Sequence, residues 1–371
     1  MSRIEAVRSA FPAHRHPQRE FTRAVTAIAE AAGGLRPRQR ALVERLHANA
    51  EVDTRYTVFP LSEYENAEAA LAAGGASAND RYIEEATALG ERALRSALAG
   101  SGLAAADLDL LIVTSVTGVA VPSLDALLIP RLGLRPDIKR LPVFGLGCVA
   151  GAAGLARLHD YLLGWPGHSA ALLAVELCSL TWRASAMETA DLVASALFGD
   201  GAAAVVAAGE AVAPPAPLLP GQPRRARAPR VIATRSEVYP DSSDTLGWRL
   251  APEGFRIVLT AELADVVERR LSGSVTAFLS DHGLTVDDIS RWICHPGGPK
   301  VLDATQKALK LPDRALALSR RSLAEAGNMS SVSVLHILEL TVDADPPEPG
   351  SFGLMIGLGP GVSAELLLLR W

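Results

Sequence analysis

Cysteine, lysine and aromatic residues are scarce in this chain of 371 residues, which contains only three cysteines and four lysines. No CxxC pair occurs among Cys148, Cys178 and Cys294, so the chain has neither a disulfide framework nor zinc-site spacing, and we expect a reducing cytoplasm. Charged residues or glycines interrupt every apolar stretch well short of the ~20 residues that a membrane span needs. No basic stripe interleaves with aromatics, and the net charge is -5, so we expect no nucleic-acid partner.

The composition is that of a folded α/β protein. Hydrophobic residues make up 49% of the chain and charged residues 21%, close to the averages of globular proteins. Continuous apolar runs of strand length alternate with helical patterns, which is typical of a layered sheet covered on both faces. These patterns predict buried strands at 108–115, 141–144, 170–176, 202–207, 291–294, 353–356 and 363–369, and helices at 19–32, 37–50 and 80–100.

One pattern occurs in both halves of the chain. Residues 102–108 read Gly-Leu-x-x-x-Asp-Leu and residues 283–289 read Gly-Leu-x-x-x-Asp-Ile, each between a predicted helix and a predicted strand. A Gly-x-Gly turn before an alternating strand follows in each half, at 199–201 and 359–361. Two landmarks in the same order indicate a duplicated unit. A common helix-stop and strand-start signal remains the alternative explanation.

A segment rich in proline, alanine and arginine separates the two halves at 211–230. Proline removes backbone donors and fixes φ, so we predict a solvated connection there. The predicted organisation is an N-terminal half at 1–210 and a C-terminal half at 231–371.

Cys148 lies where a short apolar strand meets a helix of small residues. Gly147 before it and Gly151 after it allow a sharp turn and close packing. The positive end of the helix dipole favours a thiolate at this position. This is the geometry of a nucleophile elbow with sulfur in place of the serine oxygen. A small cysteine buried in a helix-packing seam explains the segment equally well.

A nucleophilic cysteine requires a base and a group that stabilises an anion. His295 ends a predicted strand and precedes Pro-Gly-Gly-Pro, which directs it toward a crevice. Asn328 follows a glycine and precedes two serines and an apolar helix, where its ordinary role is an N-cap. Together with Cys148, these two residues form a Cys/His/Asn set.

Five motifs occur in a recognisable order. They are Gly-Cys-Val-Ala-Gly-Ala-Ala-Gly at 147–154, Leu-Phe-Gly-Asp-Gly-Ala at 197–202, His-Pro-Gly-Gly-Pro at 295–299, Gly-Asn-Met-Ser-Ser at 327–331 and Gly-Leu-Gly-Pro-Gly at 357–361. With these motifs the sequence resembles the type III polyketide synthases, the chalcone-synthase-like branch of the thiolase-fold condensing enzymes, from about residue 50 to the end. The resemblance implies an α/β fold of the duplicated, five-layer αβαβα thiolase type.

The resemblance assigns a role to each member of the Cys/His/Asn set. Cys148 would take an acyl group from a coenzyme A thioester. His295 and Asn328 would polarise the thioester carbonyl of malonyl-coenzyme A and stabilise the enolate formed as carbon dioxide leaves. An imidazolium at His295 would also lower the pKa of the Cys148 thiol. The scheme needs no metal or other cofactor, because coenzyme A thioesters are the substrates.

The family's cavity and gatekeeper positions map onto six further residues. Phe198 matches one gatekeeper phenylalanine, although an ordinary core aromatic would read the same, and Ile257 replaces the second. The resemblance places the other four in the cavity wall or in a loop that reaches the partner's cavity: Cys178, Thr181, Ser330 and Val121. Such a set looks like the microbial enzymes that extend fatty acyl starters to alkylpyrones or alkylresorcinols.

Coenzyme A contacts and assembly are further expectations from the resemblance. Arg55 sits where the family usually offers a basic residue to the coenzyme A phosphates, and Lys300 lies near the expected tunnel mouth. Basic residues such as these two are more often plain surface charges. The loop at 117–122 resembles the one through which these enzymes form homodimers.

Other functions share parts of the same residue set. A single-condensation ketoacyl synthase of type III uses the same Cys/His/Asn set on a carrier protein. A cysteine hydrolase would resolve the acyl thioester with water, and a thiolase-fold partner protein would use no catalysis. Glycines and proline at 357–361 and Phe198 in its motif favour the polyketide branch.

Overall fold

A single hydrogen-bonded sheet organises the protein. The structure is a computed structural model that describes all residues except 32, 34, 36, 65–75, 183–187, 214–228 and 252–253. The nine strands of the sheet run in the order β11-β12-β13-β8-β1-β7-β6-β4-β5. Two separate two-stranded ladders, β2-β3 and β9-β10, lie outside it. Most of the predicted connection at 211–230 falls outside the described residues.

The N-terminal half contributes five strands of the sheet and the helices that cover one of its outer faces. Its elements are β1 (Ser2–Ala10), β2 (His14–Pro17), α1 (Gln18–Ala31), α2 (Pro37–Ala48), β3 (Thr54–Thr57), α4 (Ala76–Ser101), β4 (Leu108–Thr114), α5 (Leu124–Leu132), β5 (Lys139–Val143), α6 (Ala150–Gly164), β6 (Ser169–Leu177), α7 (Thr189–Leu197) and β7 (Asp200–Gly209).

The C-terminal half contributes the other four strands. Its elements are β8 (Arg230–Val238), β9 (Leu246–Ala251), β10 (Gly254–Leu259), α8 (Leu263–Ser280), β11 (Ile289–Cys294), α9 (Pro299–Leu309), α10 (Ala317–Ala326), α11 (Ser331–Ala344), β12 (Phe352–Gly359) and β13 (Ser363–Arg370). Only two residue pairs, Ser2 with Val231 and Arg3 with Arg230, join β1 to β8. The strands of the two halves are therefore paired with each other over only a short stretch, at one end of β1 and β8.

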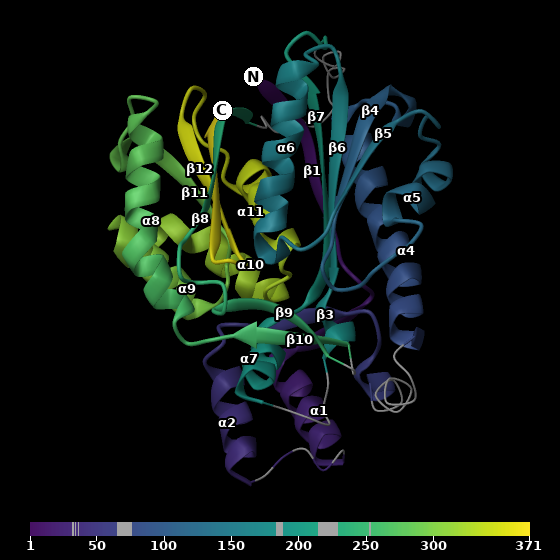
Figure 1. Cartoon of the computed structure of the whole chain (residues 1–371), viewed down its shortest axis with the longest axis vertical. Coiled ribbons are helices and arrows are strands. Elements are labelled where there is room, and N and C mark those ends of the chain that lie inside the picture. Colours follow the sequence, from purple (N-terminus) through teal and green to yellow (C-terminus); the bar gives the residue numbers. More distant parts are fainter. Residues whose placement is uncertain are drawn as a thin grey trace.

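Five layers are visible in Figure 1: α4 and α5, the strands of the N-terminal half, α6 and α11 in the middle, the strands of the C-terminal half, and α8 with α9. Alternation along the strands creates these layers, because successive side chains point to opposite faces. In β13, Leu366 and Leu368 join the outer core with α8, whereas Leu367 and Leu369 join the central core with α6 and α11. The predicted five-layer fold class is confirmed.

The two halves repeat the same local structure. Gly102 and Gly283 both adopt positive φ, +73° and +69°, which suits a residue without Cβ at a helix end. In each half the aspartate five residues later, Asp107 or Asp288, accepts a backbone N–H at 2.8 Å across a short 3-10 turn. Strands β4 and β11 follow directly, and each runs parallel to its neighbour, β6 or β12.

Strand β5 departs from the sequence prediction. A buried strand was expected at 141–144, and a strand is present, but Leu141 is 41% exposed because β5 is an edge of the sheet. The N-terminal hundred residues were predicted as mostly helical, whereas β1 lies in the middle of the sheet. Charged Arg3, Glu5 and Arg8 interrupt the apolar pattern of β1, so the sequence did not indicate a strand there.

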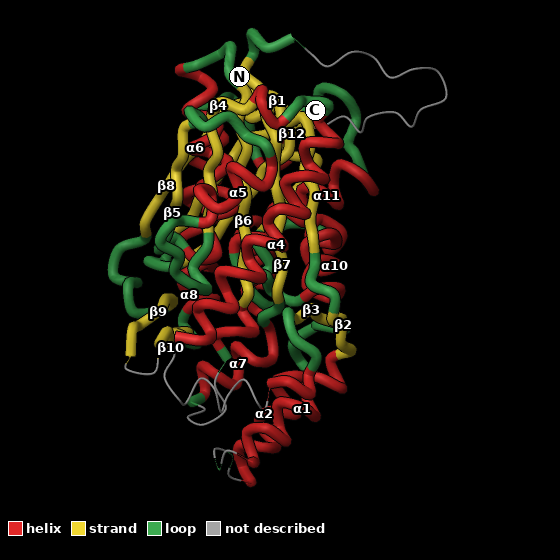
Figure 2. Tube along the Cα trace, turned by 90° about the vertical axis from the view of Figure 1, so that its right-hand side faces the viewer, coloured by secondary structure: helices red, strands yellow, loops and turns green. Residues whose placement is uncertain are grey.

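Figure 2 shows α1 and α2 at the end of the molecule away from both termini.

Candidate active site

Cys148 lies in a 3-10 turn (Gly147–Val149) that leads directly into α6. The preceding Gly147 has φ +57°, and a Cβ there would come within 2.7 Å of the Pro360 ring. A side chain at this position would therefore push away the turn between β12 and β13. The glycine lets this turn of the C-terminal half close directly over the backbone beside Cys148, whose side chain is 8% exposed.

Asn328 occupies the turn before α11. Its N–H donates to the carbonyl of Leu197 at 2.8 Å, and its own carbonyl accepts the N–H of Gly199 at 3.1 Å. The side-chain Oδ1 accepts the N–H of Ser330 at 2.8 Å, which fixes the carboxamide orientation. The amide nitrogen has no hydrogen-bond partner within the part of the chain that the structure describes, so it can donate to a ligand.

His295 follows the last residue of β11. Its backbone N–H donates to the carbonyl of Ile356 in β12 at 2.9 Å. The next residue of β12, Gly357, approaches α6 so closely that a Cβ would lie 2.6 Å from Ala152. The end of β11 is thereby brought to the start of the helix that follows Cys148. The imidazole Nδ1 is buried and has no partner among the described residues.

One small cavity collects five of the predicted site residues: Cys148, Cys178, Phe198, Ile257 and Ser330. Its volume is about 30 Å³. Ser330 lies two residues from Asn328, and its hydroxyl donates to Oε1 of the buried Glu176 at 3.4 Å. Ser330 has φ +50°, an uncommon conformation for a residue with a side chain, which is often retained at functional sites.

Burial controls the protonation of the two titratable groups. It raises the pKa of the Cys148 thiol to about 12, and the polar side chain of Ser330 opposes this rise only in part. It lowers the pKa of His295 to about 3, so the imidazole is neutral. Burial therefore disfavours the imidazolium that was predicted to lower the pKa of the thiol. A neutral imidazole can instead accept the thiol proton when the sulfur attacks.

Glu176 is a buried carboxyl beside the site that sequence reasoning did not assign. Its Oε1 accepts the Ser331 hydroxyl at 2.6 Å, and its Oε2 accepts the Thr117 hydroxyl at 3.0 Å and the Val116 N–H at 3.1 Å. Burial raises its pKa to about 7. It joins a cavity wall of the N-terminal half to the turn that carries Asn328. A glutamate inside the otherwise apolar β6 was the available signal.

The β9-β10 hairpin supplies a wall that the sequence indicated only through Ile257. Trp248 pairs with Ile257 across the hairpin, and both line the cavity with Leu246 and Gly247. Phe255, on the same face of β10 as Ile257, contacts Trp248 edge-on and Phe144 at a tilt. Since the hairpin was not predicted, nothing in the sequence placed Trp248 at the site.

Arg55 is not where the prediction placed it. Its side chain is fully buried, and its guanidinium donates to the backbone carbonyls of Ser195, Ala196 and Phe198. Burial lowers its pKa to about 9, so it stays charged at neutral pH. With its donors facing these interior carbonyls, it cannot reach the phosphates of coenzyme A, and that assignment is wrong.

The remaining predicted residues lie around the site. The Thr181 hydroxyl donates to the Cys178 carbonyl at 2.8 Å in a 3-10 turn (Cys178–Thr181), outside the residues that line the cavity. Burial raises the pKa of Cys178 well above its ordinary value. Val121 is 91% exposed. Lys300 is exposed at the N-terminus of α9.

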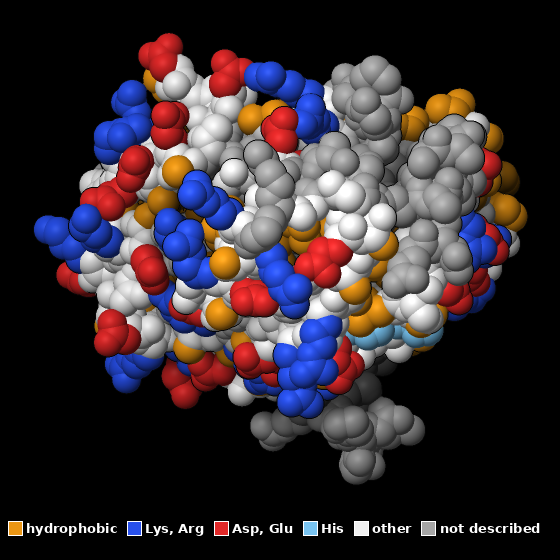
Figure 3. Space-filling model, turned by 90° about the horizontal axis from the view of Figure 1, so that it is seen from below, with side chains coloured by type: hydrophobic (Ala, Val, Ile, Leu, Met, Phe, Trp, Pro, Cys, Tyr) orange, Lys and Arg blue, Asp and Glu red, His pale blue; other side chains and the backbone are white. Residues whose placement is uncertain are grey.

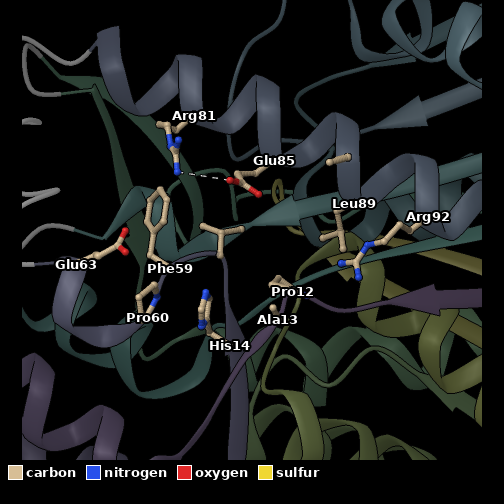
Figure 4. Close-up of a pocket in the computed structure, with 12 residues that line it drawn as sticks. Pro12, Ala13, His14, Phe59, Pro60, Glu63, Arg81, Glu85, Leu89 and Arg92 are labelled. Atoms are coloured by element: carbon tan, nitrogen blue, oxygen red, sulfur yellow. Dashed lines mark ion pairs between the residues drawn. The ribbon is translucent and has the colours of Figure 1, made fainter.

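A larger cavity of about 440 Å³ lies elsewhere, between one face of α4 and the segments that flank β2 and β3 (Figure 4). Arg81 and Glu85 form an ion pair at 3.6 Å along its rim. Its other titratable groups are His14, Glu63 and Arg92, and it contains no thiol. It lacks a nucleophile and an oriented carboxamide, so the smaller cavity at Cys148 is the candidate active site.

Three findings concern partners and ligands. On the face seen in Figure 3, acidic and basic side chains are interspersed, without a region of one sign. Within the described ranges, no three His, Cys, Asp or Glu residues are grouped to hold a metal ion. No helix in the described part of the chain has the length and apolar character to cross a membrane.

Comparison with known families agrees with the fold and the site. The profile of the chalcone and stilbene synthase N-terminal domain matches residues 2–211, and the profile of the C-terminal domain matches residues 230–371. The chain therefore belongs to the chalcone and stilbene synthases, the type III polyketide synthases. These are acyltransferases that use acyl- and malonyl-coenzyme A in decarboxylative Claisen condensations. Membership decides for iterative condensation over the single-step synthase, the hydrolase and the non-catalytic protein.

Several relatives match almost the whole chain. A 1,3,6,8-tetrahydroxynaphthalene synthase of Streptomyces peucetius subsp. caesius is 50% identical over 370 residues, which cover 99% of this chain and 93% of that protein. An alpha-pyrone synthesis polyketide synthase-like protein of Mycobacterium tuberculosis is 31% identical, covering 90% of this chain and 83% of its own length.

Solved structures show the same similarity. The crystal structure of 1,3,6,8-tetrahydroxynaphthalene synthase from Streptomyces coelicolor superposes with a TM-score of 0.87 at 29% identity. It covers 100% of this chain and 99% of that one. A polyketide synthase from the brown alga Ectocarpus siliculosus gives a TM-score of 0.86 at 26% identity, covering 100% of this chain and 98% of that one.

Proposed function

We propose that Cys148, His295 and Asn328 carry out the condensation. Cys148 attacks the acyl thioester carbonyl, its proton passes to the neutral imidazole of His295, and coenzyme A leaves as a thiol with that proton. The observation that carries this assignment is the position of Cys148, in a cavity beside the Ser330 turn whose other end fixes the Asn328 carboxamide.

The extension step follows from the same groups. When the malonyl C–C bond breaks, carbon dioxide leaves and the electron pair moves onto the thioester oxygen as an enolate. An N–H of His295 and the Asn328 amide donate hydrogen bonds to that oxygen, in a site with little water to compete. The enolate carbon then attacks the acyl group on Cys148, the sulfur leaves, and the extended chain returns to Cys148 for the next round.

Single variants separate the two roles. Cys148→Ala should abolish covalent loading, detected by intact-protein mass spectrometry. Asn328→Ala should retain loading but slow carbon dioxide release from malonyl-coenzyme A by about 10²–10³-fold, the usual effect of removing one oxyanion donor. Asn328→Asp is the matched control, since it keeps the size but removes the donor. An Asn328→Ala enzyme with unchanged carbon dioxide release would refute the assignment.

For the starter and the product, the similarity to a tetrahydroxynaphthalene synthase favours malonyl-coenzyme A alone. The 50% identical relative is named for a naphthalene, whose ten carbons correspond to five decarboxylated malonyl units. We infer that this chain primes itself with malonyl-coenzyme A and closes a pentaketide to a polyhydroxylated fused ring.

The sequence prediction of a fatty acyl starter and a pyrone or resorcinol product stays the second candidate. The aliphatic Ile257 in the cavity wall and the similarity to the mycobacterial protein support it. Mass spectrometry of products from malonyl-coenzyme A alone, and with added dodecanoyl-coenzyme A, distinguishes the two. The first candidate predicts a ten-carbon product in both reactions. Product formed only with the fatty starter would overturn it.

Trp248 offers a matched variant for that experiment. It narrows the cavity, so Trp248→Ala should increase incorporation of the dodecanoyl starter relative to the wild-type enzyme. Arg249→Ala on the opposite, exposed face of the same strand is the control and should leave the product ratio unchanged.

The homodimer is also a proposal. Strand β5 is an edge of the sheet, so one side of it offers unpaired backbone groups. Leu141 in β5, Phe144 directly after it and Val121 in the loop after β4 expose apolar surface. A second copy pairing along β5 would cover them. Leu141→Asp should then give a monomer in sedimentation velocity, whereas a wild-type monomer would contradict the proposal.

Two further expectations concern the binding of coenzyme A and the location of the enzyme in the cell. Lys300, exposed at the start of α9, is the remaining candidate for coenzyme A phosphates, and Lys300→Ala should raise KM with little change in kcat. An unchanged KM would exclude Lys300 as a contact of the coenzyme A phosphates. The cytoplasm, where coenzyme A thioesters and free thiols persist, is the proposed location; fractionation of cells checks it.

A further inference from the structure

Arg55 caps the end of α7 from within the protein. Its Nη1 donates to the carbonyls of Ser195 and Phe198, each at 2.7 Å, and its Nη2 donates to that of Ala196. Carbonyls in the last turn of a helix lack partners within the helix. A planar guanidinium can reach several of them at once, which a lysine ammonium on its flexible stem does less well.

The opposite side of the guanidinium is also fixed. Gln18 Oε1 accepts from Nε at 3.1 Å and from Nη2, while the ring of Phe21 lies 4.1 Å from the guanidinium carbon. Gln18 itself donates to the Ala196 carbonyl at 3.0 Å. Gln18 and Phe21 belong to α1 and do not line the cavity at Cys148. They hold Arg55 from the side remote from the chemistry.

The segment that Arg55 holds forms part of the active site. Phe198 lines the cavity, and Leu197 and Gly199 exchange hydrogen bonds with Asn328. The two backbones touch without side chains between them. A Cβ at Gly199 would lie 2.4 Å from the Ala326 carbonyl, and one at Gly327 would lie 2.7 Å from that of Leu197. A displacement of the end of α7 therefore moves Asn328 as well as Phe198.

We propose that Arg55 is a positioning residue for the condensation, which sets the Phe198 wall and the Asn328 carboxamide relative to Cys148 through the backbone of residues 195–199. This inference rests on the proposed roles of Phe198 and Asn328. The Cys148 turn has no contact with the guanidinium among the hydrogen bonds of the described residues, so acyl loading is independent of Arg55. Replacing Arg55 should instead affect decarboxylation and the chain length of the polyketide product.

Arg55→Lys and Gln18→Ala test the inference. Arg55→Lys keeps the charge but satisfies fewer carbonyls, and Gln18→Ala removes the support without touching the cavity. We expect Arg55→Lys to load acyl groups within about threefold of wild type, to release carbon dioxide from malonyl-coenzyme A about tenfold more slowly, and to terminate at shorter products. Gln18→Ala should also slow carbon dioxide release and shorten the products, but its effects should be smaller than those of Arg55→Lys.

Val267→Ala is the control for lost stability, because Val267 lies on α8 and is fully buried in the outer core. It should lower Tm while leaving the ratio of loading to decarboxylation and the product lengths unchanged. All variants are measured below the Tm of the least stable one. If Arg55→Lys does not fold, Gln18→Ala alone decides the outcome.

The outcomes separate this inference from the proposed function. If Asn328→Ala loses decarboxylation while Arg55→Lys and Gln18→Ala keep the wild-type ratio and product lengths, the positioning role is refuted and the catalytic assignment stands. If Asn328→Ala keeps decarboxylation, the catalytic assignment fails, and the inference fails with it. A ratio that shifts equally in Val267→Ala would also refute the positioning role.

Discussion

The two halves of the chain are copies in strand order but not in chemistry. Strands β4, β6, β7 and β1 of the N-terminal half correspond in order and direction to β11, β12, β13 and β8 of the C-terminal half. In each half a central helix begins at a site residue: Cys148 precedes α6, and Asn328 precedes α11. One copy thus supplies the nucleophile and the other the donor to the developing oxyanion.

The difference arises before the central helices. In the N-terminal half the short strand β5 leads straight into the Cys148 turn. In the C-terminal half α9 follows β11 as α5 follows β4, but α10 takes the place of β5, and His295 stands between β11 and α9. Duplication therefore supplied two equivalent helix starts facing one another, and divergence of the connecting segments supplied different side chains at each.

The largest effect is expected where the two central helices touch. A Cβ at Gly151 in α6 would lie 2.0 Å from the Ser331 carbonyl in α11. Gly151→Ala must separate the helices and should destabilise the protein by ~3 kcal/mol or more, seen in chemical denaturation. Gly164→Ala, at the other end of α6 with open space around it, is the matched control and should be neutral or slightly stabilising. Equal stability of the two variants would disprove the close contact.

Glu176, which ties the two copies together, should give the next largest effect. Its pKa is raised from an ordinary 4.5 to about 7, so the folded protein binds more protons than the unfolded chain between these values. Stability is then highest below the unfolded pKa and falls as the pH rises through 7. Glu176→Gln should remove most of this slope, by up to ~3 kcal/mol between pH 4.5 and pH 8.

The measurement is denaturant unfolding of both proteins across that pH range. Glu84→Gln, an exposed carboxyl on α4, is the control and should keep the wild-type slope. The idea would be abandoned if wild type and Glu176→Gln lost stability in parallel as the pH rises.

The smallest effect concerns the repeated turns. Asp107 and Asp288 make the same 2.8 Å bond to a backbone N–H in the two halves. Asp107→Ala and Asp288→Ala should each lower Tm by a few degrees, and Asp288→Ala by more, because Asp288 also accepts the Thr285 hydroxyl at 2.8 Å. Differential scanning calorimetry of both variants gives the comparison. A large effect at one turn only would show that the two copies no longer share this role.

The sequence predicted the fold well for strands that are buried on both faces, because their consecutive residues are apolar. Strands β6 and β7 contain long runs of alanine, leucine and valine, and their positions agree with the structure within a few residues. The motif around Cys148 and that around Asn328 also indicated their places at helix starts. These signals are local, because glycine, small residues and helix ends act on their immediate neighbours.

The errors concern residues whose environment comes from distant parts of the chain. Arg55 looks like a surface charge in the sequence, and only carbonyls some 140 positions later make its burial tolerable. Glu176 required hydroxyls from Thr117 and Ser331. Trp248 required a hairpin whose strands carry no clear alternation. Such partners cannot be read from neighbours in the sequence.

Strand β1 has a consequence for how the protein is made. Its residues, the second to the tenth of the chain, pair along their whole length with β7, which ends at Gly209. During synthesis this segment has no sheet to enter until some two hundred residues have left the ribosome. Such long-range pairing makes folding slow and leaves apolar strands uncovered in the meantime. The centre of the sheet is therefore where nascent chains would meet chaperones or one another.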